Sequence, residues 1–320
     1  MLACGPNAGC PSRSGPGPGA PTSGYFPAGT EWDRDISRAP VDPESPTVIT
    51  TLEQSGGWGT GEMRIDFSIE VLAADQGTPL RAFTPTNDFF SPDCDQAPVP
   101  LPAGGALEGE TGYECLGDGD CHLLVVYSPT RKLYEMWRAN IVGNSFRGGC
   151  LAVWDLTKRY DPLGRGDQCT SADAAGFPIA PLLFSADEVA AGTIAHAIRF
   201  ILPNERIRAR TYVRPATHAG NTSGAGTAPP YGVRLRLRAN YPLASLPNEG
   251  ARVVARALQK YGMLLSDGGN IALTAQSDRF TQHKWAGLLD ARDLAQLEVG
   301  DFEMIAAGDP IPLTFDCVRK

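Results

Sequence analysis

Four histidines are the residues of this 320-residue chain best suited to move a proton near neutral pH: His122, His196, His218 and His283. Three of them fall in or beside segments whose alternating apolar residues predict β-strands. A single histidine in such a strand is commonly a buried, hydrogen-bonded core residue. Several that converge in one cleft would instead indicate an acid–base site.

The clearest predicted element is a β-hairpin that begins at a histidine. Its strands cover 122–127 and 133–139, and its turn covers 128–131. A two- or four-residue turn places His122 on the same face as Glu135 and Trp137. A three-residue turn would replace Glu135 on that face by Tyr134 and Arg138. The pattern favours the first arrangement, with His122 and Glu135 as candidate catalytic residues.

A sheet face with a histidine, a carboxylate and an indole resembles the floor of a glycan-binding cleft. Sugar rings stack on aromatic side chains, and glycoside chemistry needs a positioned proton donor and a carboxylate. Trp137 and Tyr134 are therefore candidate substrate-binding residues. The alternative is a sandwich core in which the histidine is hydrogen-bonded and Trp137 fills space.

Two further histidines add to this hypothesis. His196 shares a predicted strand face with isoleucines, where a neutral imidazole is either structural or a tunable acid or base. His218 follows Tyr212 and Arg214 at the end of another predicted strand. A polysaccharide lyase uses these residue types, because a cation neutralises a uronate carboxylate while Tyr or His moves the proton. Tyr212 and His218 are thus candidate catalytic residues, and Arg214 a candidate substrate-binding residue.

A metal site is a weaker interpretation of the same residues. Three histidines and Asp120, two residues before His122, could ligate a metal in an oxidative enzyme. No HxH or HExxH spacing supports this, and the acidic turn at 118–120 does not continue into an EF-hand loop. We therefore predict no metal ligands and no required cofactor.

Arg234, Arg236 and Arg238 alternate with apolar residues in a predicted strand. This period-2 pattern is typical of a strand with one solvated face, and the charges would discourage pairing at a sheet edge. The functional alternative is a surface that binds an anionic polysaccharide.

Composition narrows the class of protein. The formal net charge of −8 argues against a nucleic-acid partner, because phosphate contacts need a clustered basic surface. No run of 18 apolar residues is present, so we predict no transmembrane helix. We expect a monomer whose partner is a polysaccharide.

The cysteines and the N-terminal residues predict export. Eight cysteines without zinc or CxxC redox spacing indicate disulfides formed in an oxidising compartment, and the six from Cys94 to Cys317 are expected to pair with one another. Residues 1–5, MLACG, are similar to the end of a bacterial lipoprotein signal, which makes Cys4 a possible lipid anchor. Residues 1–30 are rich in Pro, Gly and Ser and predict a flexible tether before one folded domain at 31–320. We expect a secreted or lipid-anchored, extracytoplasmic protein.

Periodicity and turn residues predict a mainly β fold. Besides the hairpin, predicted strands cover 47–52, 63–72, 150–156, 193–202, 208–213, 231–239, 263–266, 270–275 and 302–305. Predicted helices cover 185–191, 248–261 and a short segment near 291–297. We expect an antiparallel β-sandwich or jelly roll with two or three peripheral helices, in which 263–266 and 270–275 form a second hairpin.

Four segments carry a resemblance to other proteins: 185–189, 196–204 (HAIRFILPN), 215–218 (PATH) and 255–263 (ARALQKYGM). In these segments the chain resembles a group of exported bacterial proteins, and the resemblance extends over most of the sequence after Arg64. It implies export and a single fold, and it implies no particular activity.

The sequence therefore leads to three hypotheses. The first is an extracytoplasmic carbohydrate-active enzyme, a polysaccharide hydrolase or lyase, with a His/Glu/Tyr cleft on a β-sheet. The second is a non-catalytic glycan-binding or surface protein that would use Trp137, Trp154 and the arginines of the 231–239 strand. The third is the metal-dependent oxidative enzyme.

Overall fold

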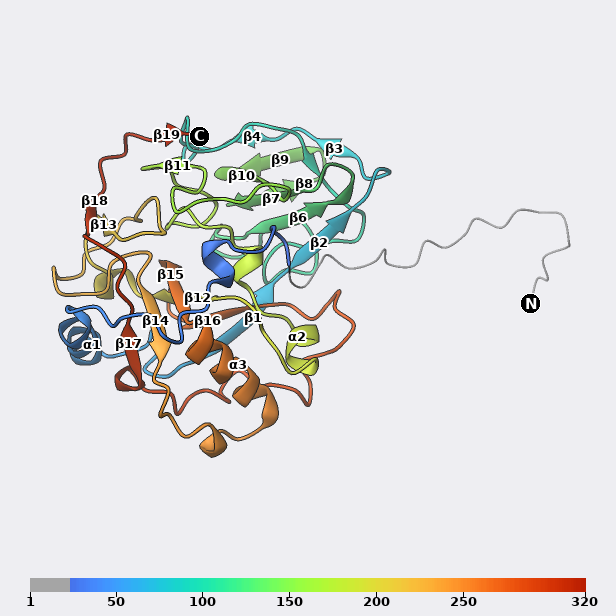
Figure 1. The fold of residues 1–320 in the computed structure, drawn as a ribbon. Coiled ribbons are helices and arrows are strands. Elements are labelled where there is room, and N and C mark those ends of the chain that lie inside the picture. The colour runs from blue at the N-terminus through green and yellow to red at the C-terminus, as the bar shows by residue number, and fades with distance from the viewer. Residues whose placement is uncertain (1–23) are drawn as a thin grey trace, which may run out of the picture.

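Two β-sheets dominate the structure, a computed structural model that describes residues 24–320. Strands account for 25% of the chain and helices for 15%, which confirms the predicted mainly β class. Within the described residues the α-helices are α1 (Ser45–Gln54), α2 (Ala186–Ala190) and α3 (Glu249–Lys260). A four-stranded sheet occupies the upper half of the molecule in Figure 1, and a six-stranded sheet the lower half.

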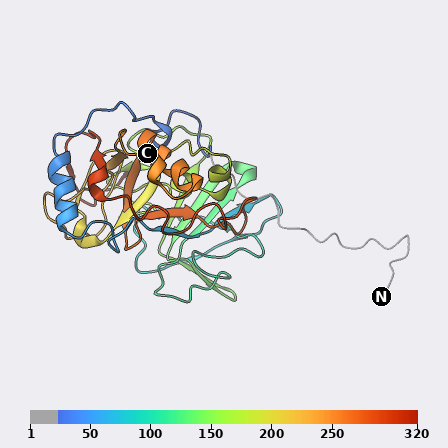
Figure 2. The ribbon, with the colours of Figure 1, turned by 90° about the horizontal axis from the view of Figure 1, so that it is seen from below.

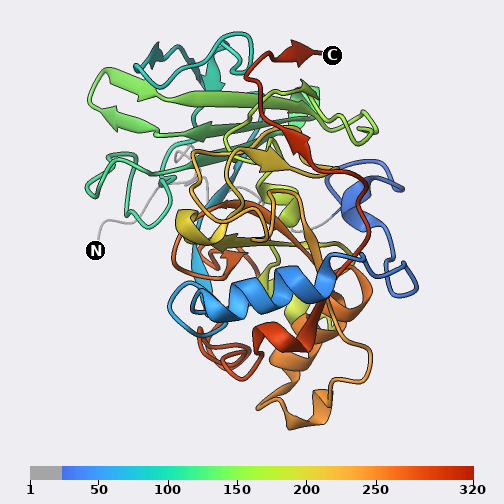
Figure 3. The same ribbon diagram turned by 90° about the vertical axis from the view of Figure 1, so that its left-hand side faces the viewer.

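The six-stranded sheet has the order β1-β16-β12-β15-β14-β17. Its strands are β1 (Ile65–Ile69), β16 (Leu273–Gln276), β12 (Ile198–Leu202), β15 (Met263–Gly268), β14 (Arg234–Leu237) and β17 (Phe302–Met304). The helix α1 packs on β17, and α3 packs on β14. Figure 2 shows α1 in blue at one edge of the molecule and α3 in orange nearer its middle, and Figure 3 shows α1 crossing the lower half.

The four-stranded sheet has the order β10-β7-β6-β2 and contains the predicted hairpin. Its strands are β10 (Cys150–Asp155), β7 (Lys132–Trp137), β6 (Leu123–Tyr127) and β2 (Val71–Ala74). Alternate residues pack into separate hydrophobic clusters on its two faces: Leu123, Val125 and Met136 on one, Leu124, Val126 and Leu133 on the other. Both faces are therefore covered, as the continuous apolar run of β6 requires.

Short strands and single turns complete the fold. The strands are β3 (Leu80–Arg81), β4 (Thr84–Pro85), β5 (Val99–Pro100), β8 (Asn140–Val142), β9 (Ser145–Gly148), β11 (Gly166–Asp167), β13 (Thr211–Tyr212), β18 (Ile311–Pro312) and β19 (Val318–Arg319). The 3-10 turns are η1 (Glu31–Asp33), η2 (Ser128–Thr130), η3 (Ala180–Leu182), η4 (Asn204–Arg206), η5 (Leu243–Ser245) and η6 (Val299–Asp301). The C-terminal segment, red in Figure 1, runs from β17 past β18 to β19 and so passes along both halves.

The two large sheets are joined directly through one residue. β1 ends at Ile69 in the six-stranded sheet and β2 begins at Val71 in the other, with the buried Glu70 between them. The sequence predicts one strand over 63–72, and the alternation is indeed continuous. The chain nevertheless changes sheets at Glu70, because Ile65 pairs with β16 whereas Val71 pairs with β6.

Three predictions about elements are wrong. Residues 47–52 form α1 rather than a strand, because Pro46 starts the helix and Val48, Ile49 and Leu52 bury one helical face. Segments 263–266 and 270–275 do not form a hairpin, since β12 lies between β15 and β16. Residues 291–297 form turns instead of a helix.

The strand pairing is also more varied than the wholly antiparallel arrangement expected. β1 with β16, β2 with β6, and β12 with β15 are parallel pairs. Parallel neighbours need long crossover connections, and here the connection from β12 to β15 contains α3.

The predicted solvated arginine face is buried. Arg234 donates hydrogen bonds to the carbonyls of Tyr261, Glu31 and Arg34. Arg236 binds the Glu303 carboxylate at 2.6 Å and donates to the carbonyls of Ile36 and Ala39. The segment at 31–39 therefore covers this face, and only Arg238 remains exposed. A polysaccharide surface on Arg234 and Arg236 is excluded by this burial.

Local signals at the helix ends are confirmed. The Asn248 side chain accepts a hydrogen bond from the Ala251 amide at 2.8 Å and starts α3, which ends before Gly262 at φ +69°. At α2, Ser185 and Glu188 form the predicted capping box. None of the described helices combines the length and the apolar character that crossing a bilayer requires.

The six cysteines from Cys94 to Cys317 pair as expected within the described chain: Cys94–Cys150, Cys115–Cys121 and Cys169–Cys317. Cys4, Cys10 and most of the predicted tether lie outside the described residues. Tyr25 is buried and packs in the same hydrophobic cluster as Trp154. Ordered packing therefore begins before the predicted boundary at residue 31.

We predict unequal contributions from two of these disulfides. The Cys169–Cys317 bond closes a segment of 148 residues and the Cys115–Cys121 bond a segment of 6. Loop-closure entropy then gives losses of about 5 kcal/mol and about 2 kcal/mol in the free energy of unfolding. Urea denaturation of the C169S/C317S and C115S/C121S double variants measures both. Equal losses would contradict the prediction.

Candidate active site

A row of polar side chains crosses the six-stranded sheet. Asp66 on β1 pairs in register with Thr274 on β16, and the Thr274 hydroxyl accepts a hydrogen bond from Arg199 on β12 at 3.3 Å. Asp267 on β15 follows an irregularity in the register between β12 and β15. The order of the strands thus brings together four polar residues that are far apart in the sequence.

Arg199 is the centre of this row. Its Nε and Nη2 donate to the two carboxylate oxygens of Asp173 at 3.2 and 2.9 Å, and Nη2 also lies 3.2 Å from Oδ2 of Asp267. Arg199 and Asp173 are both buried. Burial alone would lower the pKa of Arg199, but the two carboxylates outweigh it and raise that pKa. The guanidinium is therefore charged, and each carboxylate is bound to it.

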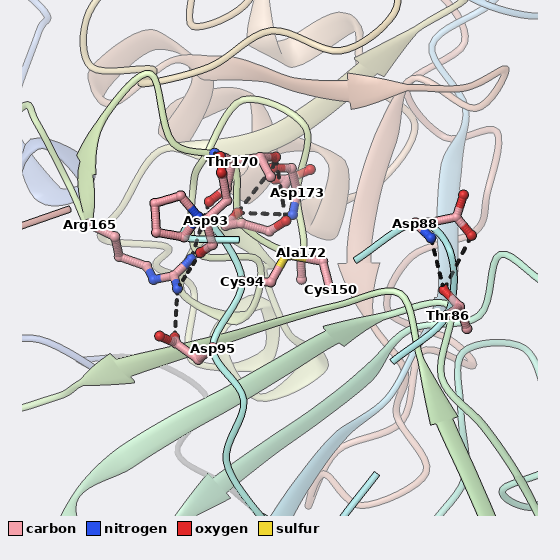
Figure 4. Close-up of a disulfide and its surroundings, with 12 residues drawn as sticks. Thr86, Asp88, Asp93, Cys94, Asp95, Cys150, Arg165, Thr170, Ala172 and Asp173 are labelled. Atoms are coloured by element: carbon pink, nitrogen blue, oxygen red, sulfur yellow. Dashed lines mark hydrogen bonds and ion pairs between the residues drawn. A yellow bond between two sulfur atoms is a disulfide. The ribbon is translucent and has the colours of Figure 1, made fainter. Parts of the chain in front are cut away.

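Asp173 belongs to the 171–177 loop, which lies between the sheets. The Ala172 carbonyl is 3.1 Å from Nε2 of His122, and the Ala174 carbonyl is 3.0 Å from Nδ1 of His218. On the other side, the Ala175 amide donates to the Ser266 carbonyl of β15 at 2.9 Å. Figure 4 shows Ala172 and Asp173 among the surroundings of the Cys94–Cys150 disulfide.

His122 forms a charged pair with Glu108. Nδ1 of His122 lies 2.6 Å from Oε2 of Glu108, so both ring nitrogens face oxygen acceptors, which only the doubly protonated ring can satisfy. Burial alone would lower the pKa of His122, but the Glu108 carboxylate outweighs it and raises that pKa to about 9. Burial likewise acts to raise the pKa of Glu108, and His122 outweighs it so that this pKa is lowered. His122 is thus a cation at neutral pH rather than a base.

Asp267 has the opposite electrostatic character. Burial, followed by repulsion from Asp173, raises its pKa to about 7, and Arg199 only partly offsets this. Its side chain is 25% exposed and that of Glu108 is 22% exposed, so both carboxyl groups reach solvent. Each also interacts electrostatically with His122. At neutral pH the site therefore holds one carboxyl group that is about half protonated, Asp267, and one that is ionised, Glu108.

Asp120 and Trp137 complete the site on its solvent side. Asp120 is exposed and accepts a hydrogen bond from Nε1 of Trp137, whose ring is half-buried. The Arg138 guanidinium lies 5.5 Å from the centroid of that ring. An aromatic ring therefore stands beside the Asp120 carboxylate.

Glu135 shares the predicted face but is closed off from solvent. Leu124 pairs with Glu135 across the hairpin, which confirms the four-residue turn and places Tyr134 on the opposite face. The Glu135 carboxylate accepts hydrogen bonds from the Ile179 and Ala180 amides and from Trp154. Burial raises its pKa to about 7. In this structure Glu135 holds the turn at 179–180 and cannot touch a substrate.

The remaining predicted residues occupy two other places. His196 lies between Oε1 of Glu188 at 3.3 Å and the Ala197 carbonyl at 2.8 Å. Tyr212 and Arg214 meet on Asp167, whose Oδ1 is 3.0 Å from the Tyr212 hydroxyl and 2.7 Å from Nη2 of Arg214.

Direct contacts within the described residues do not join all the predicted groups into one cluster. Within residues 24–320, no hydrogen bond or ion pair joins any two of His122, Glu135, His196 and His218. Tyr212 and Arg214 come together as predicted, whereas His218 binds the 171–177 loop. His122 and Glu135 belong to the four-stranded sheet, whereas His196 precedes β12 of the six-stranded sheet, and the sequence alone does not show how the two sheets meet.

Four residues of this site are not predicted from the sequence pattern: Arg199, Asp173, Asp267 and Glu108. One signal was present, because Arg199 interrupts the apolar strand 198–202 and a charge at such a position needs a buried partner. The identity of that partner depends on the path of the 171–177 loop. No local pattern gives that path.

The histidines do not gather as metal ligands. Among the described residues, the groups of three or more metal-type ligands are Asp93 with Cys169 and Cys317, and Glu110 with Cys115 and Cys121. In both groups the cysteines are disulfide-bonded and offer no thiolate. The contacts of His122, His196 and His218 described above thus give no support to the metal-enzyme hypothesis.

We predict that Arg199→Met lowers the free energy of unfolding by about 3–5 kcal/mol, because it leaves Asp173 as an uncompensated buried charge. The double variant R199M/D173N removes both charges and should recover part of this loss. Urea denaturation measures all three proteins. Arg238→Met is the control, because Arg238 is exposed and should lose less than about 1 kcal/mol. A loss in R199M no larger than in this control would contradict the central role of the pair.

The pair of His122 and Glu108 predicts a pH dependence. The pKa of His122 is about 9 in the folded state against 6.5 for a free histidine, so the folded protein retains a proton that the unfolded chain releases. Its stabilisation is complete below pH 6.5 and is lost as the pH rises through 9. Between these values stability should fall by up to about 1.4 kcal/mol per pH unit. Urea denaturation should show a shallower slope in His122→Gln but not in the exposed His283→Gln. Parallel slopes in all three proteins would contradict this.

Comparison with known proteins identifies no relative of this chain. No protein-family model, curated protein or solved structure matches the chain. The chemistry of the site therefore has to be inferred from the site's own residues.

Proposed function

We propose that this protein is a carbohydrate-active hydrolase in which Asp267 is the general acid and Glu108 the ionised carboxylate. The observation that carries the proposal is the placement of two partly exposed carboxyl groups against unlike neighbours, Glu108 at 2.6 Å from His122 and Asp267 at 3.2 Å from Arg199 in its pair with Asp173. Neighbours that push two pKa values apart assign acid and base roles to a pair of carboxyl groups. Asp267 has Asp173 beside it, and Glu108 has His122.

Glycoside hydrolysis requires this division of roles. One protonated carboxyl group donates to the leaving oxygen, and one carboxylate acts as base or nucleophile. With a pKa of about 7, Asp267 is about half protonated at neutral pH, so it can both donate and recover a proton. Glu108 is ionised in the same range because His122 lowers its pKa.

Trp137 and Asp120 support a sugar as the substrate. The half-buried indole offers a flat apolar face, and the exposed Asp120 beside it is a hydrogen-bond acceptor. Sugar rings present an apolar face and a rim of hydroxyl groups, so they match such a pair. Asp120 lies in the electrostatic field of the proposed acid and base, because both Asp267 and Glu108 act to raise the pKa of Asp120.

The contacts favour a hydrolase over a lyase. A lyase needs a cation that is free to neutralise a uronate and a base that can take a proton. Arg199 is bound by two carboxylates, and Arg214 is bound by Asp167. His122 already carries its second proton at neutral pH. Arg199, Arg214 and His122 therefore already bind partners within the protein and are not free for the steps of a lyase.

An oxidising compartment is the proposed location. Three disulfides within the described residues form and persist outside the reducing cytosol. Polysaccharides are also abundant outside the cell membrane, so the proposed substrate and the proposed location agree.

A non-catalytic glycan-binding protein is the second candidate. Trp137 and Asp120 favour it, because an aromatic ring beside an acceptor suffices to bind a sugar without chemistry. Trp154 and the buried arginines of β14 do not contribute to such a surface, since neither Trp154 nor Arg234 reaches solvent.

The test is the release of reducing ends from a panel of neutral and acidic polysaccharides. We expect Asp267→Asn and Glu108→Gln each to lower kcat by about 10²–10⁴-fold. Wild-type activity should fall as the pH rises above 7, because Asp267 loses its proton, and fall again in acid, because Glu108 gains one. Asp309→Asn and Glu114→Gln are exposed, matched controls that should retain activity.

Two outcomes would overturn the hydrolase. If the wild type binds a polysaccharide without releasing reducing ends, the glycan-binding candidate is correct. If activity is present but D267N and E108Q both retain it while folded, the reaction occurs elsewhere on the protein.

A further inference from the structure

We propose that a second site, separate from the candidate active site, binds an oxyanion of the phosphate or sulfate type. It is a cavity of about 350 Å³ at the β10 edge of the four-stranded sheet. Six cationic side chains line it: Lys132, Lys158, Arg159, Arg165, Arg319 and Lys320. This inference does not depend on the proposed hydrolase function.

The cations outnumber the acids around this cavity. Asp155 and Asp161 are the acidic residues of its lining, and Asp161 is 2.5 Å from Nζ of Lys320. Arg165 and Arg319 share a single carboxylate, that of Asp95, at 2.6 and 2.9 Å. The lining therefore keeps a positive surplus even when Asp95 is included.

Three cations in the lining have no carboxylate partner. For Lys132, Lys158 and Arg159, no carboxylate oxygen of residues 24–320 lies within ion-pair distance. Arg159 instead donates from Nε to the Gly29 carbonyl at 2.7 Å. These side chains are half-buried or exposed, so they are free to turn toward a ligand.

Arg165 provides the second observation. Its side chain is only 4% exposed, its guanidinium lies 5.7 Å from the centroid of the Trp154 ring, and it lines the cavity. Nη1 and Nη2 donate to Thr170, Asp93 and Asp95, but the buried Nε has no hydrogen-bond partner among the described residues. Figure 4 shows Arg165 extended toward Asp93 and Asp95. These contacts and the Trp154 ring hold the buried guanidinium in one position, so Arg165 gives the cavity lining a fixed positive charge.

The site is well separated from the candidate active site. Lys132 and Asp155 face each other at the far end of the β7 and β10 pair, five residues along β7 from Trp137. At about 3.4 Å per residue this is roughly 17 Å. Lys132 also points to the opposite sheet face from Trp137, because their positions differ by an odd number.

The chemistry of the lining selects the ligand class. Arginine and lysine together bind the oxygens of phosphate or sulfate, and a cavity of this size is at the small end of ligand sites. The oxyanion is either free or esterified to a sugar. The free anion and the sugar ester present the same phosphate or sulfate oxygens to the cations.

Titration calorimetry at low ionic strength tests the site with three probes: inorganic phosphate, glucose 6-phosphate and glucose. We expect saturable binding of both phosphates, weakened by added salt, and none of glucose. Tighter binding of glucose 6-phosphate identifies an esterified ligand, and equal binding identifies the free anion. Each of these two results supports an oxyanion site.

The variant Lys132→Ala/Lys158→Ala should bind phosphate at least about tenfold more weakly, because it removes two cations without breaking an ion pair. Lys260→Ala removes an exposed lysine at the end of α3 and should bind as the wild type does. Absence of saturable phosphate binding by the wild type would overturn the proposal. So would glucose binding as tightly as its phosphate, or equal binding by the double variant and the wild type.

Discussion

The buried ion pair between Arg199 and Asp173 is the interaction on which the rest of the structure depends. A guanidinium in the middle of an apolar sheet is costly to desolvate, and the bidentate carboxylate of Asp173 compensates that cost. Asp173 in turn fixes the 171–177 loop between the sheets. Because His122 and His218 both bind carbonyls of this loop, the one pair sets the position of side chains from both halves of the molecule.

The same pair determines the acid–base character of the site. Burial, followed by repulsion from Asp173, raises the pKa of Asp267, so Asp267 keeps its proton to a higher pH than an isolated aspartate. Glu108 has a cationic histidine within 2.6 Å and loses its proton more readily. Two similar carboxyl groups thus differ only through their neighbours. Stability and proposed chemistry are therefore consequences of one arrangement of charges.

Elements that depend on nearby residues could be predicted, and those that depend on distant partners could not. The hairpin register that places Glu135 and Trp137 with His122, and the caps of α2 and α3, are set by residues a few positions apart. The helix α1 has β-branched residues that favour a strand, and the start at Pro46 together with packing on β17 and η6 outweighs that preference. The alternating pattern of β14 predicts a solvent-exposed face, because no residue near β14 in the sequence indicates that segment 31–39 covers it.

The direct passage from β1 to β2 through Glu70 has a consequence for the order of assembly. Starting at β2, the four-stranded sheet is complete once residues 71–155 are available. In contrast, Ile65 pairs with Leu273, about 208 positions later in the chain. During synthesis from the N-terminus, the four-stranded sheet can therefore close before the partner strand of β1 is available. The six-stranded sheet depends on pairings between more distant residues, and such pairings form more slowly.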